Sequence, residues 1–352
     1  MFKDLIDWSR ENFSKLPWRK KRTLYTTFVS EIMLQQTTVA TVENHFEKFI
    51  KKYPNLKSLA SSTEEDLLVA WKGLGYYRRA KNLRLAAMEM MEKNRGLFPK
   101  THDELLEIHG IGPYTASAMM AIGRDQWSLA VDANLERVIA RIYGLEEFKG
   151  PKLQKEIWKK FEQKKILKNA RSFSAREVNE ALMDLGRTLC QAGKTRCEVC
   201  FFKKSCRAHL SGDPLSYPRK ALKDKDQTKK KYYDLVLLRV ICHKNKKMAA
   251  IKKEKKQWLS GQYEVPTFII SSEDQSLNQY PVIPKKLKEH LDIDGPFFKS
   301  AITKYRITNY VLSISHTKFQ KLGDFGDLEW LADDQLNQIS TSSMKAMDKI
   351  SC

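Results

Sequence analysis

The chain has 352 residues, enough to bury a sizeable core and to form two domains. Its 63 Lys and Arg residues against 42 Asp and Glu give a formal net charge of +21. This charge favours a polyanionic partner, nucleic acid above all, although a membrane surface or ribosomal neighbours would also attract it. No apolar run approaches the roughly eighteen residues that a membrane span needs, and the N-terminus alternates charged and apolar groups, so we expect neither a membrane segment nor a signal peptide.

The first part of the chain has helical periodicity. Apolar residues recur every three or four positions, which predicts helices at 4–13, 25–36, 39–51 and 64–71. Glu31 lies in the second of these among apolar Phe28, Ile32 and Leu34. If buried, such a glutamate has a raised pKa and can stay protonated to donate its proton, whereas the other interpretation is a solvent-facing residue on an amphipathic helix.

Two stretches beside these helices have compositions suited to nucleic acid. Residues 35–38 read Gln-Gln-Thr-Thr, and short amides of this kind either pair with base edges or cap a turn. Residues 73–82 place Tyr76 and Tyr77 with three cations after a glycine turn. This composition suits stacking on bases beside phosphate contacts, or equally a solvated basic helix face.

A hairpin of two helices is predicted around residues 105–118. The first helical pattern ends at Ile108, Gly110 and Gly112 permit the positive φ of a tight turn, and Pro113 suits the first position of the next helix. Backbone N–H groups at such a helix start bind a phosphate oxygen without reading a base, although a Gly-x-Gly between helices is also an ordinary turn.

Asp132 begins another predicted helix, whose apolar face is Leu135, Val138, Ile139 and Ile142. The carboxylate is thereby fixed at a rigid helix entrance, where it serves either as an N-cap alone or as a charged group beside a bound strand. Further helical patterns at 157–161 and 178–189 make the first domain nearly all helical.

Four of the six cysteines follow within seventeen residues, spaced C-x6-C-x2-C-x5-C among basic side chains. They are Cys190, Cys197, Cys200 and Cys206. The clustering predicts a metal site in a reducing compartment rather than a disulfide framework, and zinc and an iron–sulfur cluster both fit four thiolates.

The composition changes after residue 210. We interpret 1–210 as the helical domain with the cysteine loop at 190–206, and the Pro- and Lys-rich residues 211–231 as a linker. Strand patterns at 232–241, 248–251, 263–270 and 305–314 predict a smaller α+β domain over 232–345, and residues 346–352 are expected to be a frayed tail.

Together these segments resemble an adenine DNA glycosylase of the MutY type, in the helix-hairpin-helix superfamily that also holds endonuclease III. The motifs that carry the resemblance cover nearly the whole chain: Leu16-Pro17-Trp18-Arg19, 30–37, 73–77, Gly110-Ile111-Gly112-Pro113-Tyr114-Thr115-Ala116, Val131-Asp132-Ala133-Asn134, 179–186 and the four-cysteine loop. Ala133 stands where the family commonly has glycine.

The resemblance implies two catalytic carboxyl groups. Glu31 would protonate the purine leaving group at N7, and Asp132, ordered by Asn134, would stabilise the oxocarbenium-like sugar. We expect apolar surroundings to raise the pKa of Glu31 and a helix N-terminus to keep Asp132 ionised. Tyr114 assists at the active centre where endonuclease III relatives carry a Schiff-base lysine, which implies a monofunctional enzyme that leaves an abasic site.

Other implied roles concern binding. Trp18, Arg19 and Asp184 would line the pocket for the extruded adenine, and Gln36 and Tyr76 would probe the duplex at the opposite base. The loop at Gly110 and Gly112 would hold the DNA backbone, and the four cysteines would hold a [4Fe-4S] cluster.

The C-terminal half resembles the Nudix-like domain that recognises 8-oxoguanine. Residues 258–266 match a family stretch, but no Glu-rich pyrophosphatase box follows. Where the family usually has Phe-Ser-His, this chain has Ile302-Thr303-Lys304 in the register set by Phe298, so Thr303 keeps a hydroxyl and Lys304 a donor, but the imidazole and the aromatic ring are absent.

We therefore expect a monomeric glycosylase acting on double-stranded DNA with adenine opposite 8-oxoguanine or guanine, located in the bacterial cytoplasm near the nucleoid or in a eukaryotic nucleus. One alternative is a glycosylase that has lost the 8-oxoguanine preference and acts on G:A mispairs. Another is a non-catalytic DNA damage sensor, against which the presence of both Glu31 and Asp132 argues.

Overall fold

The computed structural model describes residues 1–219, 232–254, 256–289, 295–321 and 327–350. The chain divides into two compact units. The helical unit comprises Met1–Ser62 and Arg78–Lys223, and the sheet unit comprises Thr63–Tyr77 and Asp224–Cys352. In the part of the chain that is described, no helix combines the length and the apolar character needed to cross a membrane.

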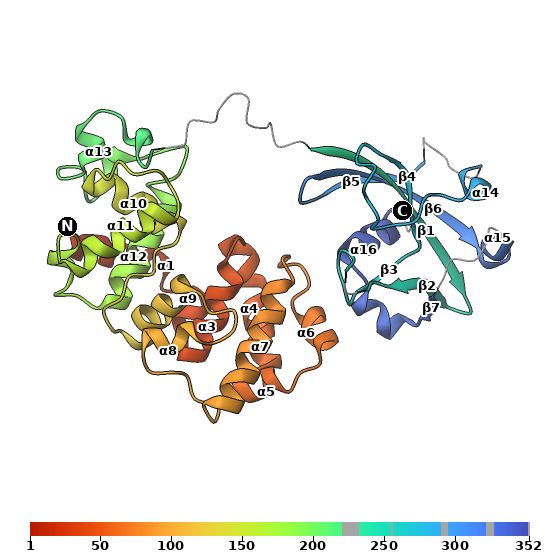
Figure 1. Ribbon diagram of the computed structural model, residues 1–352, viewed down its shortest axis with the longest axis horizontal. Coiled ribbons are helices and arrows are strands. Elements are labelled where there is room, and N and C mark those ends of the chain that lie inside the picture. The colour runs from red at the N-terminus through yellow and green to blue at the C-terminus, as the bar shows by residue number, and fades with distance from the viewer. Residues whose placement is uncertain (220–231, 255, 290–294, 322–326, 351–352) are drawn as a thin grey trace. The chain divides into compact units, whose positions relative to one another are not determined.

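Helices make up the regular elements of the helical unit in its described residues (Figure 1). Its main helices are α1 (Phe2–Phe13), α2 (Pro17–Lys20), α3 (Leu24–Leu34), α4 (Val39–Lys52), α5 (Leu56–Ala60), α7 (Arg78–Lys93), α8 (His102–Leu106), α9 (Pro113–Ala118), α10 (Ala133–Tyr143), α11 (Pro151–Glu162), α12 (Ala175–Thr188) and α13 (Arg207–Leu210). Short turns of other helix types lie at Met119–Gly123, Lys168–Ala170, Cys197–Val199 and Pro214–Ser216. The predicted helices at 4–13, 25–36 and 39–51 are confirmed to within a few residues.

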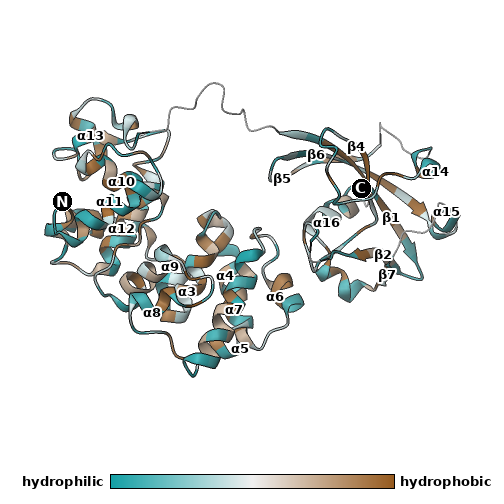
Figure 2. Cartoon of the chain, viewed as in Figure 1, coloured by the Kyte–Doolittle hydropathy of each residue, from teal (hydrophilic) through white to brown (hydrophobic). Residues whose placement is uncertain are grey.

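The helices are amphipathic, and their apolar faces make the core. In Figure 2 single helices carry both brown and teal, as expected for helices with one buried face. α1 and α10 both pack against α12. Leu5, Val138, Ile139, Leu182 and Leu185 are fully or almost fully buried in this cluster. The face predicted for the helix after Asp132 is therefore the face that the protein buries.

The predicted hairpin is present as α8, a turn and α9, which begins at Pro113 as expected. Gly110 has φ +77°, and a Cβ there would lie 2.8 Å from the Cβ of Asn82, so glycine is required on both counts. Gly112 differs from the expectation, because its φ is −94° and any residue can adopt it. Space around Gly112 is open, with nothing within 4 Å of an added Cβ.

The sheet unit contains one helix from the first part of the chain, α6 (Glu64–Ala70), and one seven-stranded sheet. The strands are β1 (Tyr233–Lys244), β2 (Lys247–Lys252), β3 (Tyr263–Glu264), β4 (Thr267–Ser272), β5 (Phe297–Ile302), β6 (Tyr305–Ser315) and β7 (Leu328–Leu331). The order is β3-β2-β1-β6-β5, with β4 also pairing with β1 and β7 with β2. β1 and β6 run parallel, and β5 and β6 form an antiparallel hairpin. Helices α14 (Lys285–Lys288), α15 (His316–Lys321) and α16 (Thr341–Asp348) complete the unit, with a short 3-10 helix at Asp333–Gln338.

A buried ion pair lies inside the sheet unit. Glu264 accepts hydrogen bonds from Arg239 (3.1 Å), Tyr280 (2.8 Å) and Ser340 (3.2 Å). Arg239 and Glu264 side chains are 1% and 2% exposed, and the positive groups around the carboxylate hold its pKa below its ordinary value despite burial. Because Ser340 is the N-cap of α16, its hydrogen bond to Glu264 ties the start of α16 to the sheet.

Two expected boundaries are wrong. The first part of the predicted linker packs on the helical unit. Arg141 donates a hydrogen bond to the backbone carbonyl of Tyr217 (3.0 Å), and the N–H of Lys149 donates one to the backbone carbonyl of Arg219 (3.1 Å). Residues 220–231, the rest of that linker, lie outside the described residues. The predicted frayed tail begins inside a helix, because α16 continues to Asp348 and buries Ala346 completely, and residues 351–352 lie outside the described residues.

Candidate active site

One cleft of the helical unit gathers most of the predicted catalytic and substrate-binding residues. Its volume is about 940 Å³. Predicted residues that line it are Trp18, Arg19, Glu31, Gln36, Tyr114, Asp132, Asn134 and Asp184. They come from α2, α3, α9, α10, α12 and the turn after α3, so segments more than 150 residues apart along the chain meet in this cleft.

Glu31 is a buried carboxyl group on the last turn but one of α3. Glu31 is 4% exposed, and the Tyr114 hydroxyl donates a short hydrogen bond to its carboxyl group. Burial raises the pKa of Glu31 to about 7, with further increases from the charges of Glu180 and Asp132. The Tyr114 hydrogen bond and the charge of Arg19 act in the opposite direction. Glu31 can therefore hold a proton near neutral pH and give it up.

Asp132 is the N-cap of α10. Its carboxylate accepts hydrogen bonds from the backbone N–H groups of Asn134 (2.9 Å) and Leu135 (2.7 Å) and from the Asn134 side chain (2.7 Å). Burial nevertheless raises the pKa of Asp132, and these three donors only oppose the increase. The helix N-terminus therefore does not lower the pKa of Asp132 below its ordinary value, because desolvation outweighs the cap.

A chain of hydrogen bonds connects Asp132 with the cysteine loop. The Asn134 side-chain oxygen accepts a bond from Arg137 (2.9 Å), and Arg137 also donates to the carbonyls of Cys190 (2.8 Å) and Gly186 (2.7 Å). Gly186 allows this approach, because a Cβ there would lie 2.7 Å from the Cβ of Asn134. Arg137 carries no sequence motif of its own, and its role was not predicted.

Arg19 is held in the cleft wall by acidic partners. Its guanidinium donates to both oxygens of Asp184, at 2.8 and 3.3 Å, and lies 3.5 Å from Glu180. Asp184 also accepts from Ser9 (2.6 Å) and Arg187 (3.0 Å). Since four hydrogen bonds occupy its carboxylate, Asp184 orients Arg19 and has little capacity left for a ligand.

Glu180 is a cleft residue that sequence reasoning missed. It lies one helical turn before Asp184 on α12, and burial raises its pKa. The signal was available, because a residue four positions from a predicted site residue shares its helix face. Glu180 pairs with Arg22 (2.5 Å) and adds a second acid–base group to the wall.

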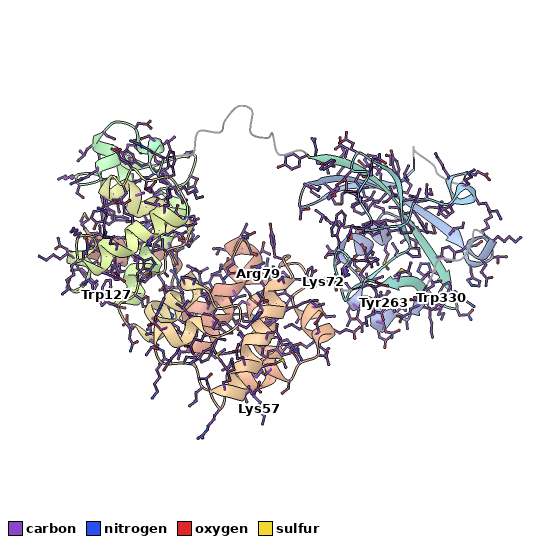
Figure 3. All side chains as sticks on the ribbon, viewed as in Figure 1. Lys57, Lys72, Arg79, Trp127, Tyr263 and Trp330 are labelled. Carbon is purple, nitrogen blue, oxygen red and sulfur yellow. The ribbon has the colours of Figure 1, made fainter. Side chains whose placement is uncertain are left out.

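Arg79 holds the turn that carries Gln36. It donates to the carbonyls of Ile32 (2.8 Å), Met33 (2.9 Å) and Gln35 and to the Thr37 hydroxyl (2.9 Å). Figure 3 labels this side chain. Gln36 itself adopts φ +56°, which non-glycine residues rarely adopt, so Arg79 maintains a strained turn at the cleft edge.

The remaining predicted contacts belong to the sheet unit. Tyr76 has φ +47° and is 63% exposed. Thr303 and Lys304 form the two-residue tip of the β5–β6 hairpin, beyond the last pair Ile302 and Tyr305. They do not line the cleft described above.

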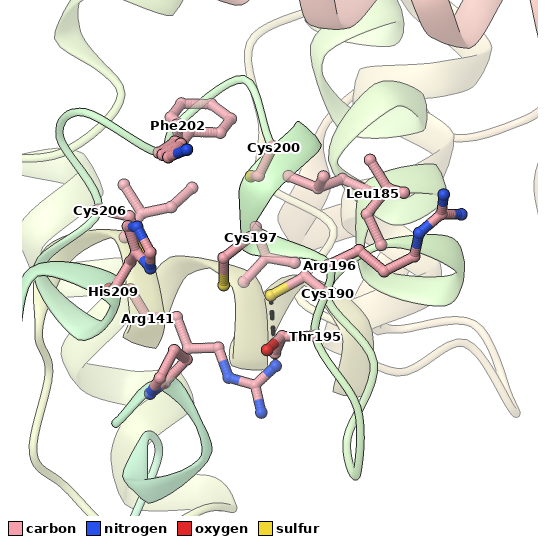
Figure 4. A pocket seen from close by; sticks show the side chains of 15 residues that line it. Arg141, Leu185, Cys190, Thr195, Arg196, Cys197, Cys200, Phe202, Cys206 and His209 are labelled. Atoms are coloured by element: carbon pink, nitrogen blue, oxygen red, sulfur yellow. Dashed lines mark hydrogen bonds between the residues drawn. The ribbon is translucent and has the colours of Figure 1, made fainter. Parts of the chain in front are cut away.

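The four clustered cysteines line one pocket of the helical unit, shown in Figure 4. Arg141 donates to the Cys190 sulfur (3.3 Å), and the Cys206 thiol donates to the Arg141 carbonyl (3.3 Å). Across the described part of the chain, no three Cys, His, Asp or Glu side chains are gathered closely enough to hold one metal ion. Four cysteine thiols that line one pocket are a donor set that fits an iron–sulfur cluster or a zinc ion.

Comparisons with known proteins place this fold and site in a class. The HhH-GPD family, described as "HhH-GPD superfamily base excision DNA repair protein", matches residues 29–163, which include Glu31, the hairpin and Asp132. The structure is also similar to that of a thermostable thymine-DNA glycosylase, with a TM-score of 0.50 and 25% identity, covering 60% of this chain and 95% of that one.

Proteins with similar sequences show which family within the base excision repair class this chain belongs to. Adenine DNA glycosylase of Buchnera aphidicola subsp. Schizaphis graminum is 33% identical over 256 residues, 72% of this chain and 71% of that protein. The enzyme of the subspecies Acyrthosiphon pisum is 37% identical over 221 residues, 62% of each chain, and the human one is 34% identical over 214 residues, 58% of this chain and 38% of that protein. The chain belongs to the adenine DNA glycosylase family. It spans 62% of the length of the Buchnera aphidicola subsp. Acyrthosiphon pisum enzyme and 38% of the length of the human enzyme, less than two thirds of each.

The buried Glu31 should cost stability at alkaline pH. Its pKa is higher in the folded than in the unfolded chain, so stability is full below the unfolded-state pKa of 4.5 and is lost as the pH rises through about 7. Glu31→Gln removes this loss. We expect its free energy of unfolding, measured by urea denaturation with tryptophan fluorescence, to exceed that of the wild type by roughly 2–3 kcal/mol at about pH 8 and by much less at about pH 5.

The matched control is Glu47→Gln, which changes an exposed glutamate of α4 in the same unit. Its difference from the wild type should not vary with pH in this range. An equally constant difference for Glu31→Gln would show that Glu31 is solvated and ionised throughout.

Proposed function

We propose that this chain is a monofunctional DNA glycosylase that hydrolyses the N-glycosidic bond of adenine mispaired with 8-oxoguanine or guanine and leaves an abasic site. The observation that carries the proposal is the pairing, in one cleft, of a buried carboxyl with a pKa of about 7 and a second carboxyl fixed at a helix entrance. Membership in the adenine DNA glycosylase family supports the choice of base.

Glu31 is proposed as the general acid. Adenine leaves as a poor anion unless the ring is protonated, and a carboxyl that keeps its proton at neutral pH can supply it at N7. Tyr114 donates to the Glu31 carboxyl, so it orients the group and stabilises the carboxylate that remains after proton transfer.

Asp132 is proposed to stabilise the cationic sugar. Departure of the base leaves positive charge on the deoxyribose, and a carboxylate held by three donors cannot rotate away from it. The buried location strengthens the attraction, since little water screens it. Charge on Asp132 also raises the pKa of Glu31, so one group's ionisation supports the other's protonation.

Recognition of DNA is proposed to use the rest of the cleft and the hairpin. Trp18 and Arg19, with Asp184 behind, form a wall against which an extruded adenine would be held, and Glu180 adds a hydrogen-bonding group missed from sequence. The turn at Gly110 and Gly112 would hold the backbone, because the space beside Gly112 is open to a phosphate. Gln36 and Tyr76 are proposed to enter the duplex at the opposite base.

Cleavage of the strand is not part of the proposed reaction. Lyase chemistry needs an amine that attacks the sugar carbon, and Tyr114 stands where that lysine would lie by the resemblance. Its hydroxyl is committed to Glu31, and burial raises its pKa well above the ordinary value, so it is a poor nucleophile.

The four cysteines are proposed to hold a [4Fe-4S] cluster. When bound, this group would order the loop 190–206 and its basic side chains against DNA. Arg137 reaches from the Cys190 carbonyl to Asn134, so order in the loop supports the position of Asp132. Arg141 lies beside the Cys190 sulfur and would balance negative charge on the thiolates.

The C-terminal domain is proposed to be Nudix-like and to read the base opposite adenine. Thr303 and Lys304 lie at the tip of the β5–β6 hairpin, beyond the last paired residues, and we propose that this tip contacts the duplex. A hydroxyl in this position can pair with a purine edge.

Single-turnover adenine release tests the proposed function. Duplexes with adenine opposite 8-oxoguanine or guanine should lose adenine without strand cleavage until heat or base is added, because no amine is poised for elimination. Release should be faster opposite 8-oxoguanine. Glu31→Gln should lower the rate constant by a factor of at least about 100, the usual contribution of general acid catalysis.

Each other outcome identifies a different error. Equal rates opposite both bases would make the chain a general A:G mispair glycosylase, and strand cleavage without treatment would refute the monofunctional assignment. Binding without any release would favour the damage-sensor alternative.

Metal analysis tests the cluster. The purified chain should be brown and should contain about four iron atoms and matching sulfide per chain, and Cys197→Ser should lower the iron content. Cys242→Ser, which changes a buried cysteine of β1 outside the pocket, is the control and should keep its iron. A colourless chain with one zinc would contradict the assignment.

A further inference from the structure

The β5–β6 hairpin ends in a tip with an unfavourable backbone. Thr303, a β-branched residue, adopts φ +51° at the first position of the two-residue turn, where glycine or asparagine is usual. Such a conformation persists only where surrounding contacts determine it. The two strands end at the pair Ile302 and Tyr305, so these contacts must come from another segment.

Asp274, thirty residues earlier in the chain, supplies them. Its carboxylate oxygen Oδ2 accepts hydrogen bonds from Lys304 Nζ (3.0 Å) and from the Tyr305 hydroxyl (2.6 Å). Its other oxygen accepts from the Ser276 hydroxyl (2.6 Å) and the Ser276 N–H (3.1 Å). Four donors fix one carboxylate, which is 8% exposed.

The Lys304 side chain, which remains 50% exposed, is held by this arrangement on one side. Its ammonium lies 4.5 Å from the centre of the Tyr233 ring and 5.3 Å from that of Tyr305, and its carbonyl accepts from the Tyr233 N–H (2.9 Å). The charge of Lys304 is therefore paired with Asp274 and lies near two aromatic rings. Donors around Asp274 also hold the pKa of its carboxyl well below the ordinary value, so the pair stays ionised at all physiological pH.

We infer that Asp274 is a positioning residue for recognition of the base opposite adenine: through Lys304 and Tyr305 it clamps the hairpin tip in the one conformation that presents Thr303. Lys304 is part of the clamp and does not itself contact the base. The inference rests on the proposed function, and it assigns Lys304 a different role from the direct donor that the sequence predicts.

Binding and turnover measured separately test the clamp. The ratio of dissociation constants for guanine and 8-oxoguanine duplexes, each with the uncleavable 2′-fluoro analogue of deoxyadenosine opposite, reports discrimination. Asp274→Asn should lower this ratio by about tenfold, as expected for losing charge-assisted hydrogen bonds. The saturating single-turnover rate of adenine release opposite guanine should stay within about twofold of wild type, because the cleft residues are unchanged.

Asp234→Asn is the matched control. It removes the same charge from the same unit, but its ion-pair partner is Arg306 on β6 at 3.4 Å and not a residue of the hairpin tip. It should leave the ratio unchanged. Asp274→Glu, which keeps the charge and both acceptor oxygens, should restore part of the ratio lost in Asp274→Asn.

A double variant tests whether the two residues act as one unit. Lys304→Gln alone should lower the ratio about as much as Asp274→Asn, and the double variant should lower it no further. Additive losses would show that Lys304 contacts the base independently and would overturn the inference. A wild-type ratio in Asp274→Asn would overturn it as well.

The two proposals fail differently. A wild-type chain that binds mispairs with discrimination but releases no adenine refutes the proposed reaction, while the binding ratios still decide the role of Asp274. A wild-type chain that releases adenine with no discrimination in binding refutes the clamp alone.

Discussion

The burial of one carboxyl group, that of Glu31, is the constraint on which the helical unit depends. Removing a carboxylate from water costs several kcal/mol, so the protein keeps the group neutral and raises its pKa to about 7. Burial, the Tyr114 hydroxyl from α9 and the charge of Asp132 at the start of α10 all act on this one proton. The packing of the helices keeps Glu31 in the cleft although its burial lowers the stability of the fold. Such a loss of stability is expected at a site that function requires.

The second carboxyl group, that of Asp132, is held by a series of hydrogen bonds that reaches the cysteine loop. Asp132 is fixed by Asn134, Asn134 by Arg137, and Arg137 by the carbonyl of Cys190 in the cysteine loop. A metal cluster held by that loop would thus support catalysis through structure alone. The sheet unit uses the same device, since Asp274 fixes a strained turn through Lys304 as Arg79 fixes the turn at Gln36. In both units, a charged side chain from another segment holds the turn that carries a proposed DNA contact.

Much of the site could be predicted because local sequence sets it. Pro113 starts α9 and Asp132 caps α10, and both follow from residue type and position. Arg79, Arg137 and the Lys304 pair could not be found, because their partners lie on other segments and come together only through packing. The pKa of Asp132 was misjudged for the same reason, since a cap is visible in sequence but depth of burial is not. The tail at 346–350 looked polar, yet Ala346 and its neighbours bury one helix face.

The pH dependence of the single-turnover rate of adenine release tests the central claim, that protonated Glu31 is the acid, most directly. With the enzyme saturating, the rate constant should fall tenfold for each unit of pH above the pKa of Glu31, near 7, because only the protonated form donates. In the wild type, the hydrogen bond from Tyr114 lowers the pKa of Glu31. Tyr114→Phe removes this bond, so the pH at which the rate begins to fall should be higher in the variant. A rate that rises with pH through this range would contradict the account.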